Sequence, residues 1–481
     1  MPFLSYARAL ELRRQLQGTR AEVICIGCDD YATSIRRWSD TCEKEAGAVV
    51  RVASTAEVAE VVRFCRKHHI DFVVEAGGHS TTGASSSHGG VVISLAKMRK
   101  VLTDPASETV CVQGGATWDM VNHSTAPYGL AVVGAMTSHA GVGGSTLGGG
   151  SGWLTGQYGL IADQLVGVKV VLADGTIVEA SNEDNQDLFW AMRGAGQAFG
   201  IATEFVFRAH KVRDKCFGGM IVYDVTKLPM LVDFANEFDR RQDPNSGFYF
   251  GFAWSRDEKK IVLQAVVFYH GSAYNGGIFF DPILYQNRLM NPLDNYTGTK
   301  LYVEMNSFAN VDPVPEGRKS ISGANIMRPL ETSLLQDLYN QFAEAMNTYP
   351  RMKDSVLMFD YLPYKKTVEV PVEDTACANR GPYCSAKLLL CWHDSELDAK
   401  MHALQRSIIS KILEAQRGIP DDHGVACPNL AGHDVSVEKL YGPNLPRLQK
   451  LKRKYDPHNV FRKWHDLLAP AKSHVEQTDK S

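Results

Sequence analysis

The sequence predicts an α+β protein of two domains. Its 481 residues are enough for two or three domains of ordinary size. Up to about residue 212, short apolar strands alternate with helices and glycine-rich turns. From there to about residue 433 the glycine motifs stop, and longer strands alternate with longer helices. That second pattern is typical of an antiparallel sheet with helices on one face.

The elements of the first domain follow from local periodicity. Residues 55–68 carry apolar side chains at helical spacing, and Thr55 stands where an N-cap is expected. The order of elements indicates an α+β module rather than a doubly wound sheet. The expected elements are the helix 55–68, strands over 72–75, 91–95 and 110–113, a helix over 117–125, a hairpin of 166–172 with 177–179, a helix over 187–192 and a strand over 200–207.

The second domain and the chain end are predicted in the same way. The expected strands are 247–254, 261–270 and 386–392, and the expected helices are 333–346 and 396–414. A basic helix and an Asp456-Pro457 stop follow within 437–468. The predicted boundaries are therefore a first domain over 1–212, a second domain over 213–433, a C-terminal segment over 434–470 and a polar tail over 471–481.

Charge and composition exclude several classes of function. The net charge of −3 and the lack of a basic cluster longer than 450–454 argue against a nucleic-acid or anionic-membrane partner. No window approaches 18 uncharged apolar residues, and Arg8 and Glu11 interrupt the N-terminal stretch. We therefore expect a cytoplasmic protein with reduced cysteines. Cys25 and Cys28 form a CxxC without a second pair, so no metal site is predicted. The oligomeric state stays open.

Glycine is concentrated in one segment. Ten of the 41 glycines fall between Gly134 and Gly159, whereas the rest are spread at an ordinary density. A run of glycine permits close backbone approach or positive φ, and its successive N–H groups can form a nest for a pyrophosphate. A flexible linker is the alternative, but Val142, Leu147 and Trp153 within the run disfavour it.

A second glycine-rich turn follows the strand at 72–75. The sequence Gly77-Gly-His-Ser-Thr-Thr-Gly83 offers backbone N–H groups, three hydroxyls and one imidazole. His79 alone is typical of an ordinary turn histidine. Two nests about 60 residues apart instead favour one extended diphosphate ligand, and hence a dinucleotide.

Five stretches, in order, resemble one enzyme family. They are VVEAGGHSTTG, VQGGATW, GVGGSTLGGGSGWLTGQYGLIADQLVG, DLFWAMRGAGQAFGIATEF and LYGPNLPRLQKLKRKYDPHNVF. The chain resembles the FAD-linked oxidases of the vanillyl-alcohol oxidase and p-cresol methylhydroxylase superfamily, in the berberine-bridge-enzyme-like branch. The resemblance implies a two-domain FAD-linked oxidase fold. In it, an FAD-binding domain of two α/β subdomains accompanies a substrate domain with an antiparallel sheet covered by helices.

The resemblance also implies how FAD is held. His79 matches the residue joined covalently to the 8α-methyl of FAD, and a neutral imidazole of ordinary pKa near 6.5 can act as that nucleophile. Some relatives add a second link from a cysteine, but Thr137 occupies that place here. We therefore expect a single link through His79. The implied cofactor-binding residues are Gly77, Gly78, His79, Ser80, Thr81, Thr82, Gly83, Thr137, Gly141, Gly143, Gly144, Ser145, Thr146, Gly148, Asp163, Gly200, Ile201 and Thr203.

Two of these positions carry separate expectations. By the resemblance, Ser145 matches a position beside the flavin that governs oxygen access, and its small size favours an oxidase. Asp163 matches an aspartate of the relatives, where a structural role and a cofactor role are equally open. By the same resemblance, Asn444 and Arg447 are expected to hold the C-terminal segment on the FAD domain.

The implied function is FAD-dependent oxidation of a small organic metabolite, such as a specialised metabolite. The substrate is an alcohol or amine, or undergoes oxidative ring closure, with hydride transfer to flavin and reoxidation by O2 to H2O2. A redox-neutral cyclase or isomerase is the alternative, and a flavin-binding protein without turnover is a third reading. The candidates for the catalytic base are Tyr361, Tyr364, Tyr383, His393 and His465.

Overall fold

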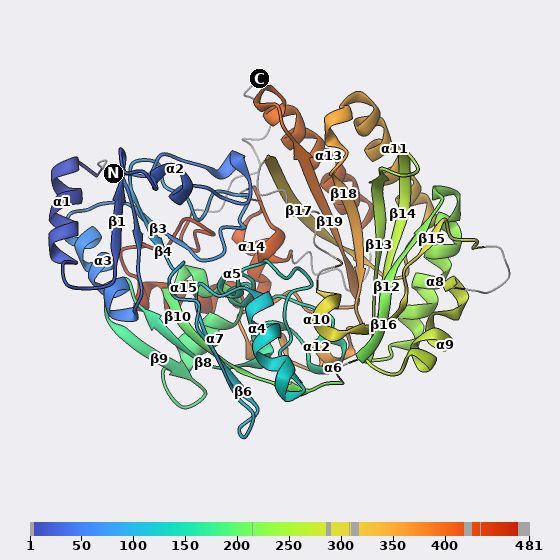
Figure 1. Cartoon of the computed structure of the whole chain (residues 1–481), viewed down its shortest axis with the longest axis horizontal. Helices are drawn as coiled ribbons and strands as arrows, with labels where there is room; N and C mark the ends of the chain where they lie inside the picture. The colour runs from blue at the N-terminus through green and yellow to red at the C-terminus, as the bar shows by residue number, and fades with distance from the viewer. Residues whose placement is uncertain are drawn as a thin grey trace.

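The computed structural model describes residues 4–213, 215–284, 290–306, 308, 317–417, 426–432 and 434–469. The chain forms two lobes (Figure 1). The first lobe, drawn in blue to teal, contains the elements of the first domain, and the second, drawn in green to orange, contains a large antiparallel sheet. Within the part of the chain that is described, no helix is both long and apolar enough to cross a membrane.

The first sheet has the strand order β1-β2-β4-β3. Strands β2, β4 and β3 pair in parallel, and β1 joins antiparallel. Helix α3 (Thr55–Lys67) connects β2 to β3 and buries its apolar stripe, as the periodicity predicts. Its N-cap is Ser54, not Thr55, because the Ser54 hydroxyl accepts from the N–H of Glu57. The strands are β1 (Glu22–Cys25), β2 (Ala48–Arg51), β3 (Phe72–Glu75) and β4 (Val91–Ser94).

The second sheet has the order β5-β6-β10-β8-β9 and is antiparallel. The predicted hairpin is confirmed, since β8 and β9 pair across the turn at Asp174–Gly175. Helices α4 (Trp118–Thr125), α5 (Val142–Leu147) and α7 (Gln186–Ala195) belong to this half of the chain. The strands are β5 (Val101–Asp104), β6 (Thr109–Gln113), β8 (Leu165–Val171), β9 (Ile177–Ser181) and β10 (Ile201–Arg208).

The third sheet forms the second lobe, with the order β15-β12-β14-β13-β18-β19-β17 and β16 pairing with β12. All of its pairs are antiparallel, as expected. The strands are β12 (Lys215–Tyr223), β13 (Ser246–Ser255), β14 (Lys260–Tyr269), β15 (Asp294–Asn295), β16 (Gly298–Leu301), β17 (Arg318–Met327), β18 (Val356–Tyr361) and β19 (Tyr383–Trp392). The helices are α8 (Leu228–Arg241), α9 (Ala273–Leu284), α11 (Thr332–Thr348) and α13 (Asp398–Ala415).

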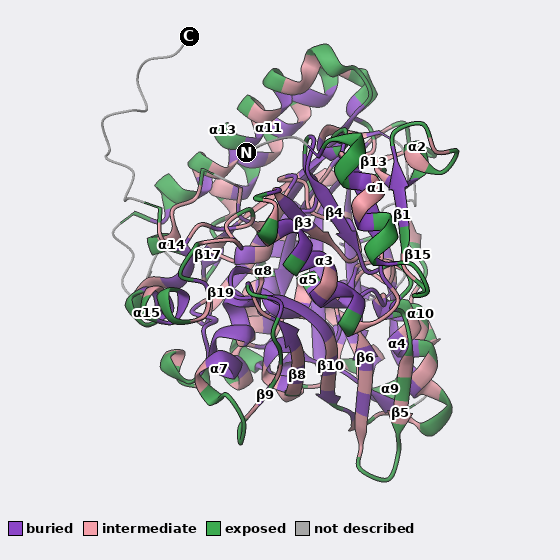
Figure 2. Ribbon diagram, turned by 90° about the vertical axis from the view of Figure 1, so that its left-hand side faces the viewer, coloured by how far each residue is buried: buried purple, intermediate pink, exposed green. Residues whose placement is uncertain are grey.

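These helices cover the outer face of the third sheet (Figure 1). Phenylalanines 248, 250 and 359 point into the core that they share with the helices. Because side chains alternate along a strand, the neighbouring residues point to the opposite face, toward the first lobe. Figure 2 shows the resulting pattern, with buried residues concentrated where helices meet sheets and exposed residues on the outer helix surfaces. The third sheet is therefore buried on one face by helices and leaves the other for the site.

The C-terminal segment returns to the first lobe. Helix α15 (Leu445–Tyr455) contacts α7, and residues of α14 (Val437–Tyr441) share the core of the second sheet. The red C-terminal elements accordingly lie among the blue and teal ones in Figure 1. The basic helix expected in 437–468 corresponds to α15. Segments from both ends of the chain thus surround the region between the lobes.

Candidate cofactor and substrate site

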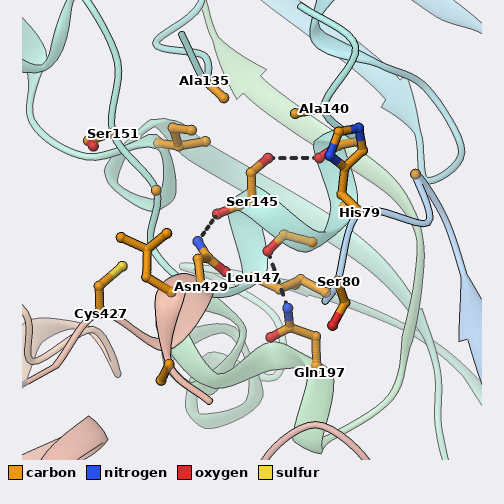
Figure 3. Close-up of a pocket in the computed structure, with 18 of the residues that line it drawn as sticks. His79, Ser80, Ala135, Ala140, Ser145, Leu147, Ser151, Gln197, Cys427 and Asn429 are labelled. Carbon is orange, nitrogen blue, oxygen red and sulfur yellow. Dashed lines mark hydrogen bonds between the residues drawn. The ribbon is translucent and has the colours of Figure 1, made fainter. Parts of the chain in front are cut away.

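A cavity of about 520 Å³ lies between the two lobes. That size falls in the usual range for ligand sites. One wall comes from the loop after β3, the segment around α5 and the start of β10. The other comes from strands β13, β18 and β19, and the segments 427–431 and 460–464 close it. Figure 3 shows the region in which His79, Ser145, Gln197 and Asn429 converge.

Two glycine loops cross at the centre of the first wall. A Cβ on Gly77 would lie 2.7 Å from the Cα of Gly141, and a Cβ on Gly141 would lie 2.8 Å from the Cα of Gly77. Neither position can carry a side chain unless the backbones separate. Gly78, with φ +67°, turns the chain directly after the crossing in a way that favours glycine. The crossing therefore fixes the His79 loop against the start of α5.

Only part of the glycine run faces the cavity. A Cβ on Gly144 would meet nothing within 4 Å, and Gly144 lines the cavity. By contrast, a Cβ on Gly148 would lie 2.0 Å from Asn429 Oδ1, and one on Gly149 2.7 Å from Cys377 Sγ. Those two glycines admit side chains from the C-terminal half of the chain. The excess of glycine thus serves packing between distant segments as well as a ligand wall.

His79 lies in a stack of rings at the edge of the cavity. It stacks on Trp38 with a centroid distance of 5.0 Å and on His139 with one of 4.7 Å. His79 Nε2 is 2.8 Å from His139 Nδ1. Burial, together with His139 and Lys319, lowers the pKa of His79 to about 3. The imidazole of His79 is therefore neutral, as a nucleophile requires.

The polar atoms of the first wall fit a ligand rich in hydrogen-bonding groups. In the described part of the chain, Ser85 Oγ and Gln197 Oε1 are buried without a hydrogen-bond partner, and both residues line the cavity. Leaving a buried polar atom unpaired costs about 1–3 kcal/mol, so a polar ligand there would be stabilising. Together with the open Gly144, these atoms match what a dinucleotide such as FAD needs.

Most of the predicted cofactor-binding residues line the cavity, and some do not. The lining residues among them are Gly77, Gly78, His79, Ser80, Thr81, Thr82, Thr137, Gly141, Gly143, Gly144, Ser145, Gly200 and Ile201. Gly83, Thr146, Gly148, Asp163 and Thr203 lie outside the lining. Thr146 Oγ1 bonds back to Val142 O within α5, and Thr203 Oγ1 accepts from Thr55, so both hydroxyls serve the fold. Neither hydroxyl faces the cavity, and the assignment of these five residues to the cofactor site stays a prediction.

Ser145 lines the cavity, and its hydroxyl is hydrogen-bonded to other residues of the protein. Its Oγ donates to Gly141 O at 2.8 Å and accepts from Trp118 Nε1 at 2.8 Å. Asn429 Nδ2 donates to Ser145 O at 3.0 Å, which connects α5 to the C-terminal segment (Figure 3). Ser145 is thus held in one orientation.

The second wall is a strip of alternating strand residues. Asp360 of β18 pairs in register with Tyr249 of β13 and with Ser385 of β19, and Met358 pairs with Lys387. All five residues line the cavity. Lys387 Nζ donates to Asp360 Oδ2, and Asp360 is the one carboxylate among the described residues of the lining. A charged pair is thereby placed on a wall that also carries aromatic, apolar and polar side chains.

Of the three tyrosines predicted as candidates for the base, two line the cavity and one lies in the core. Tyr383 and Tyr364 line the cavity. Tyr361 does not, because it is one residue out of phase with Asp360 and lies in the core beneath the helices. Its ring lies 4.5 Å from the Arg328 guanidinium. The structure therefore places the Tyr361 side chain away from the cavity, and this geometry does not favour it as the base.

The two histidine candidates also lie away from the cavity. His393 follows the end of β19 at an exposed position beside Gly317. His465 is buried, with Nε2 3.3 Å from Pro428 O, while its neighbour Trp464 lines the cavity instead. The structure places neither histidine on the cavity wall, so this geometry does not favour either as the base.

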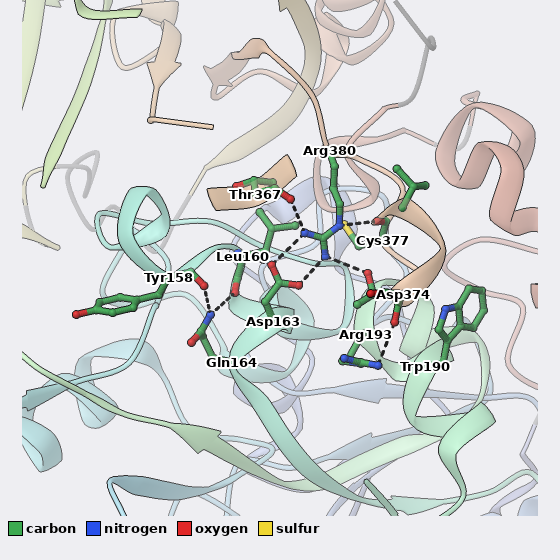
Figure 4. A network of polar contacts seen from close by, with 12 residues as sticks. Tyr158, Leu160, Asp163, Gln164, Trp190, Arg193, Thr367, Asp374, Cys377 and Arg380 are labelled. Atoms are coloured by element: carbon green, nitrogen blue, oxygen red, sulfur yellow. Dashed lines mark hydrogen bonds and ion pairs between the residues drawn. The ribbon is translucent and has the colours of Figure 1, made fainter. Parts of the chain in front are cut away.

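Asp163 forms a buried ion pair between the lobes. Its Oδ1 lies 2.5 Å from Arg380 Nη2, and its Oδ2 lies 3.0 Å from Arg380 Nη1 (Figure 4). Arg380 also donates to Thr367 O and Thr375 Oγ1. The Arg380 side chain is 1% exposed and that of Asp163 8%. Of the two roles left open for Asp163, the structure supports the structural one.

Asn444 and Arg447 hold the C-terminal segment in place. Asn444 Nδ2 donates to Val372 O and Thr375 O, and the Arg447 guanidinium lies 4.0 Å from the Trp190 ring centroid of α7. Arg447 therefore contacts the first lobe, as expected, whereas Asn444 contacts the loop between β18 and β19.

Sequence reasoning missed Asp360, Lys387, Arg380 and His139. A lysine within the apolar run of β19 was a usable signal, because a charge in a buried strand needs a partner. His139 precedes the glycine run but matches no position quoted for the family. Its role depends on the loop crossing, which spacing along the chain does not reveal.

The comparisons with known proteins agree with this geometry. A family model described as FAD binding domain matches residues 46–181, and one described as berberine and berberine like matches residues 428–465. The FAD-linked oxidoreductase pgmH of Aspergillus terreus is 33% identical over 480 residues, covering 95% of each chain.

Two solved structures share the fold. The 6-hydroxy-D-nicotine oxidase of Arthrobacter nicotinovorans superposes with a TM-score of 0.79 at 22% identity, covering 92% of this chain and 97% of that one. The xylooligosaccharide oxidase of Myceliophthora thermophila, in complex with xylobiose, gives 0.78 at 20% identity, covering 94% and 97%. The predicted two-domain FAD-linked oxidase fold is confirmed.

We expect Asp163→Asn to destabilise the protein by about 3–5 kcal/mol, because it leaves the buried Arg380 charge uncompensated. Denaturant unfolding measures the change. Asp354→Asn is the matched control, since it removes the half-exposed partner of the exposed Arg256 and is expected to cost less than about 1 kcal/mol. Equal effects of the two substitutions would contradict the role of Asp163.

Proposed function

We propose a function from the premise that this chain belongs to the FAD-linked oxidoreductases with a berberine-like C-terminal segment. The chain oxidises an alcohol or amine of a small organic, specialised metabolite, or closes a ring in it oxidatively. The observation that carries the proposal is that one cavity joins the glycine-loop wall with His79 to a wall bearing Asp360, Lys387 and Tyr383. Cofactor and substrate can therefore meet face to face.

FAD, when bound, would accept a hydride from a substrate C–H and pass the electrons to O2, giving H2O2. On this chain, Gly143, Gly144 and Ser145 would approach it from one side and Ser80 to Thr82 from another. Ser85 Oγ and Gln197 Oε1 would gain the hydrogen bonds they lack. The residues of the first wall thus bind and orient the cofactor through backbone and hydroxyl groups.

A single covalent link through His79 fits the chemistry of the cavity. His79 is neutral and lines the first wall. Thr137 supplies a hydroxyl where some relatives have a cysteine, and a hydroxyl is a far weaker nucleophile. Cys427 also lines the cavity, but it lies on the far side of Asn429 from His79 (Figure 3), and burial raises the pKa of its thiol.

The second wall supplies a proton acceptor for the substrate. We assign this role to Asp360, whose carboxylate forms an ion pair with the Lys387 ammonium. Tyr383 has a different part, because burial raises its pKa well above the ordinary value and it keeps its proton. Its hydroxyl donates to Asn379 Oδ1 at 2.6 Å, so its oxygen can accept a hydrogen bond from a substrate O–H or N–H. Tyr383 orients the substrate and Asp360 takes the proton.

The remaining lining favours a ring-containing substrate that carries polar groups. Met358, Leu362 and Pro363 are apolar, and Tyr249 and Tyr364 are aromatic. Arg328, Asn379 and Ser385 add polar atoms to the same wall. Flat apolar surfaces of this kind favour stacking with rings. The cavity therefore suits an aromatic or alicyclic metabolite better than a simple sugar.

One observation also favours a redox-neutral cyclisation or isomerisation. Asp360 and Lys387 place an acceptor and a donor of protons side by side, as such a reaction needs. Production of one H2O2 for each product molecule supports the oxidase, and product without peroxide supports the redox-neutral reaction.

We expect the purified protein to be yellow and its flavin to stay in the pellet after acid precipitation. His79→Ala should release that flavin into the supernatant, because the nucleophilic nitrogen is gone. Thr137→Ala is the control and should leave the flavin in the pellet. Flavin that washes out of the unsubstituted protein would contradict the covalent link.

We expect Asp360→Asn to slow anaerobic bleaching of the flavin by about 10²–10⁴-fold, because the amide cannot accept the proton. A panel of alcohols, amines and sugars first identifies a substrate, and stopped-flow absorbance then follows the flavin. Tyr361→Phe is the matched control on the same strand, since its hydroxyl lies in the core beneath the helices. A wild-type rate for Asp360→Asn would rule out this carboxylate as the base.

A further inference from the structure

His139 lies behind His79, as seen from the cavity. His79 lines the cavity, whereas His139 is not among its described lining residues. The two rings stack at a centroid distance of 4.7 Å and an angle of 25°, and His79 Nε2 lies 2.8 Å from His139 Nδ1. The imidazole of His139 therefore faces His79 rather than a ligand.

The surroundings of the pair keep both rings neutral. Burial, and then Lys319, lower the pKa of His139, and burial, His139 and Lys319 lower that of His79. A backbone hydrogen bond to His139 opposes the shift at His79 only in part. Lys319 Nζ donates to Trp38 O at 2.9 Å and lies 5.6 Å from the Trp38 ring, on which His79 stacks. Between two neutral imidazoles, one N–H must donate to the lone pair of the other.

The backbone of His139 is held from two sides. Trp118 N donates to Ala140 O at 3.1 Å, and Asp119 N donates to Ser138 O at 2.8 Å. The start of α4 is therefore hydrogen-bonded to the residues on both sides of His139. Ser138 N donates to Asn306 O at 3.1 Å in the second lobe. The ring is thus presented to His79 by a fixed turn.

We propose that His139 is a positioning residue for the covalent attachment of FAD to His79. Its Nδ1 accepts the Nε2–H of His79, which leaves the lone pair of His79 on Nδ1, the ring nitrogen that the imidazole of His139 does not engage. The inference rests on the covalent link proposed above. It adds which nitrogen of His79 reacts and which residue selects it.

The covalent attachment requires only His79, His139, FAD and O2. A bond forms between His79 Nδ1 and the 8α-methyl carbon of FAD, and one C–H bond of that methyl group breaks. The Nε2–H bond of His79 also breaks, and its proton passes to His139 Nδ1 over 2.8 Å. The electron pair of the C–H bond would reduce the cofactor. O2 would take up that pair together with two protons, the one lost from the methyl group and the one received by His139, and would leave as H2O2 with the cofactor oxidised again.

The test measures the rate of covalent attachment. The full chain, produced in riboflavin-limited cells, is mixed with FAD, and acid-stable flavin is followed by in-gel fluorescence and intact mass. His139→Leu should slow attachment by about 100-fold, while FAD still binds and is released by acid. His139→Asn places an amide oxygen near the position of Nδ1 and should restore attachment to within about tenfold of wild type.

A pH profile gives a second readout. Because the pKa of His79 is about 3, the ring is neutral at higher pH, and wild-type attachment should be flat from about pH 5 to 8. Attachment should fall only as the pH approaches that value and the nitrogen becomes protonated. A decline centred near the ordinary value of 6.5 would contradict the neutral pair.

His210→Leu is the matched control for loss of a buried, stacked histidine. His210 stacks on Tyr158 at 3.6 Å and bonds to Gln164, outside the cavity lining. It should attach flavin at the wild-type rate. Attachment by His139→Leu at that rate, equal failure of the Asn and Leu variants, or an equal loss in His210→Leu would each overturn the role of His139. Absence of acid-stable flavin from the wild type would overturn the His79 link itself.

Discussion

The contact of Gly77 with Gly141 is the constraint on which the rest of the site depends. Two backbones meet there without side chains between them, so the loop after β3 and the start of α5 have one relative position. His79 stands two residues after one glycine and His139 two residues before the other. The contact of their rings at 2.8 Å follows from the crossing of the backbones. A methyl group at either glycine would separate the rings as well as the loops.

Contacts from the second lobe hold the cavity walls in place in addition to the contact between the two glycines. Arg380 pairs with Asp163, Asn429 fills the space beside Gly148, and strand β17 supplies Lys319 to the ring stack. Each contact joins parts of the chain that are far apart in sequence. The cavity is therefore a property of the assembled lobes, and its two walls are held at a fixed separation by polar contacts as well as by apolar packing.

Local patterns predicted the local structure well. Helix α3, strand β3 and the hairpin of β8 with β9 were placed to within a residue or two, because each has its own apolar period. The glycine loops and His79 were found for a similar reason, since their signal is local and chemical. The N-cap of α3 was predicted at Thr55 and is Ser54 in the structure, which is the usual uncertainty of helix ends.

The placements that local patterns could not predict depend on tertiary contacts. Tyr361 and Asp360 are neighbours in sequence but point to opposite faces of β18, and only the packing of the helices decides which face is buried. Gly148 looked like part of a ligand wall because spacing cannot show that Asn429 approaches it. His139 carries no signal apart from its position near a glycine, and its meaning appears only when the loops cross.

Because β17 contacts the N-terminal loops, the site can form only after the ribosome has synthesised β17. Thr81 Oγ1 bonds to the backbone of Ile321, 240 residues later, and Ser39 Oγ bonds to that of Lys319, 280 residues later. A ribosome adding about 5–20 residues each second needs roughly 10–50 s to cover the first of these gaps. During that interval the loop that carries His79 emerges without the strand that supports it. Maturation of this site is thus an event of the finished chain, and the nascent N-terminal half must remain folded or protected until its partner strand is made.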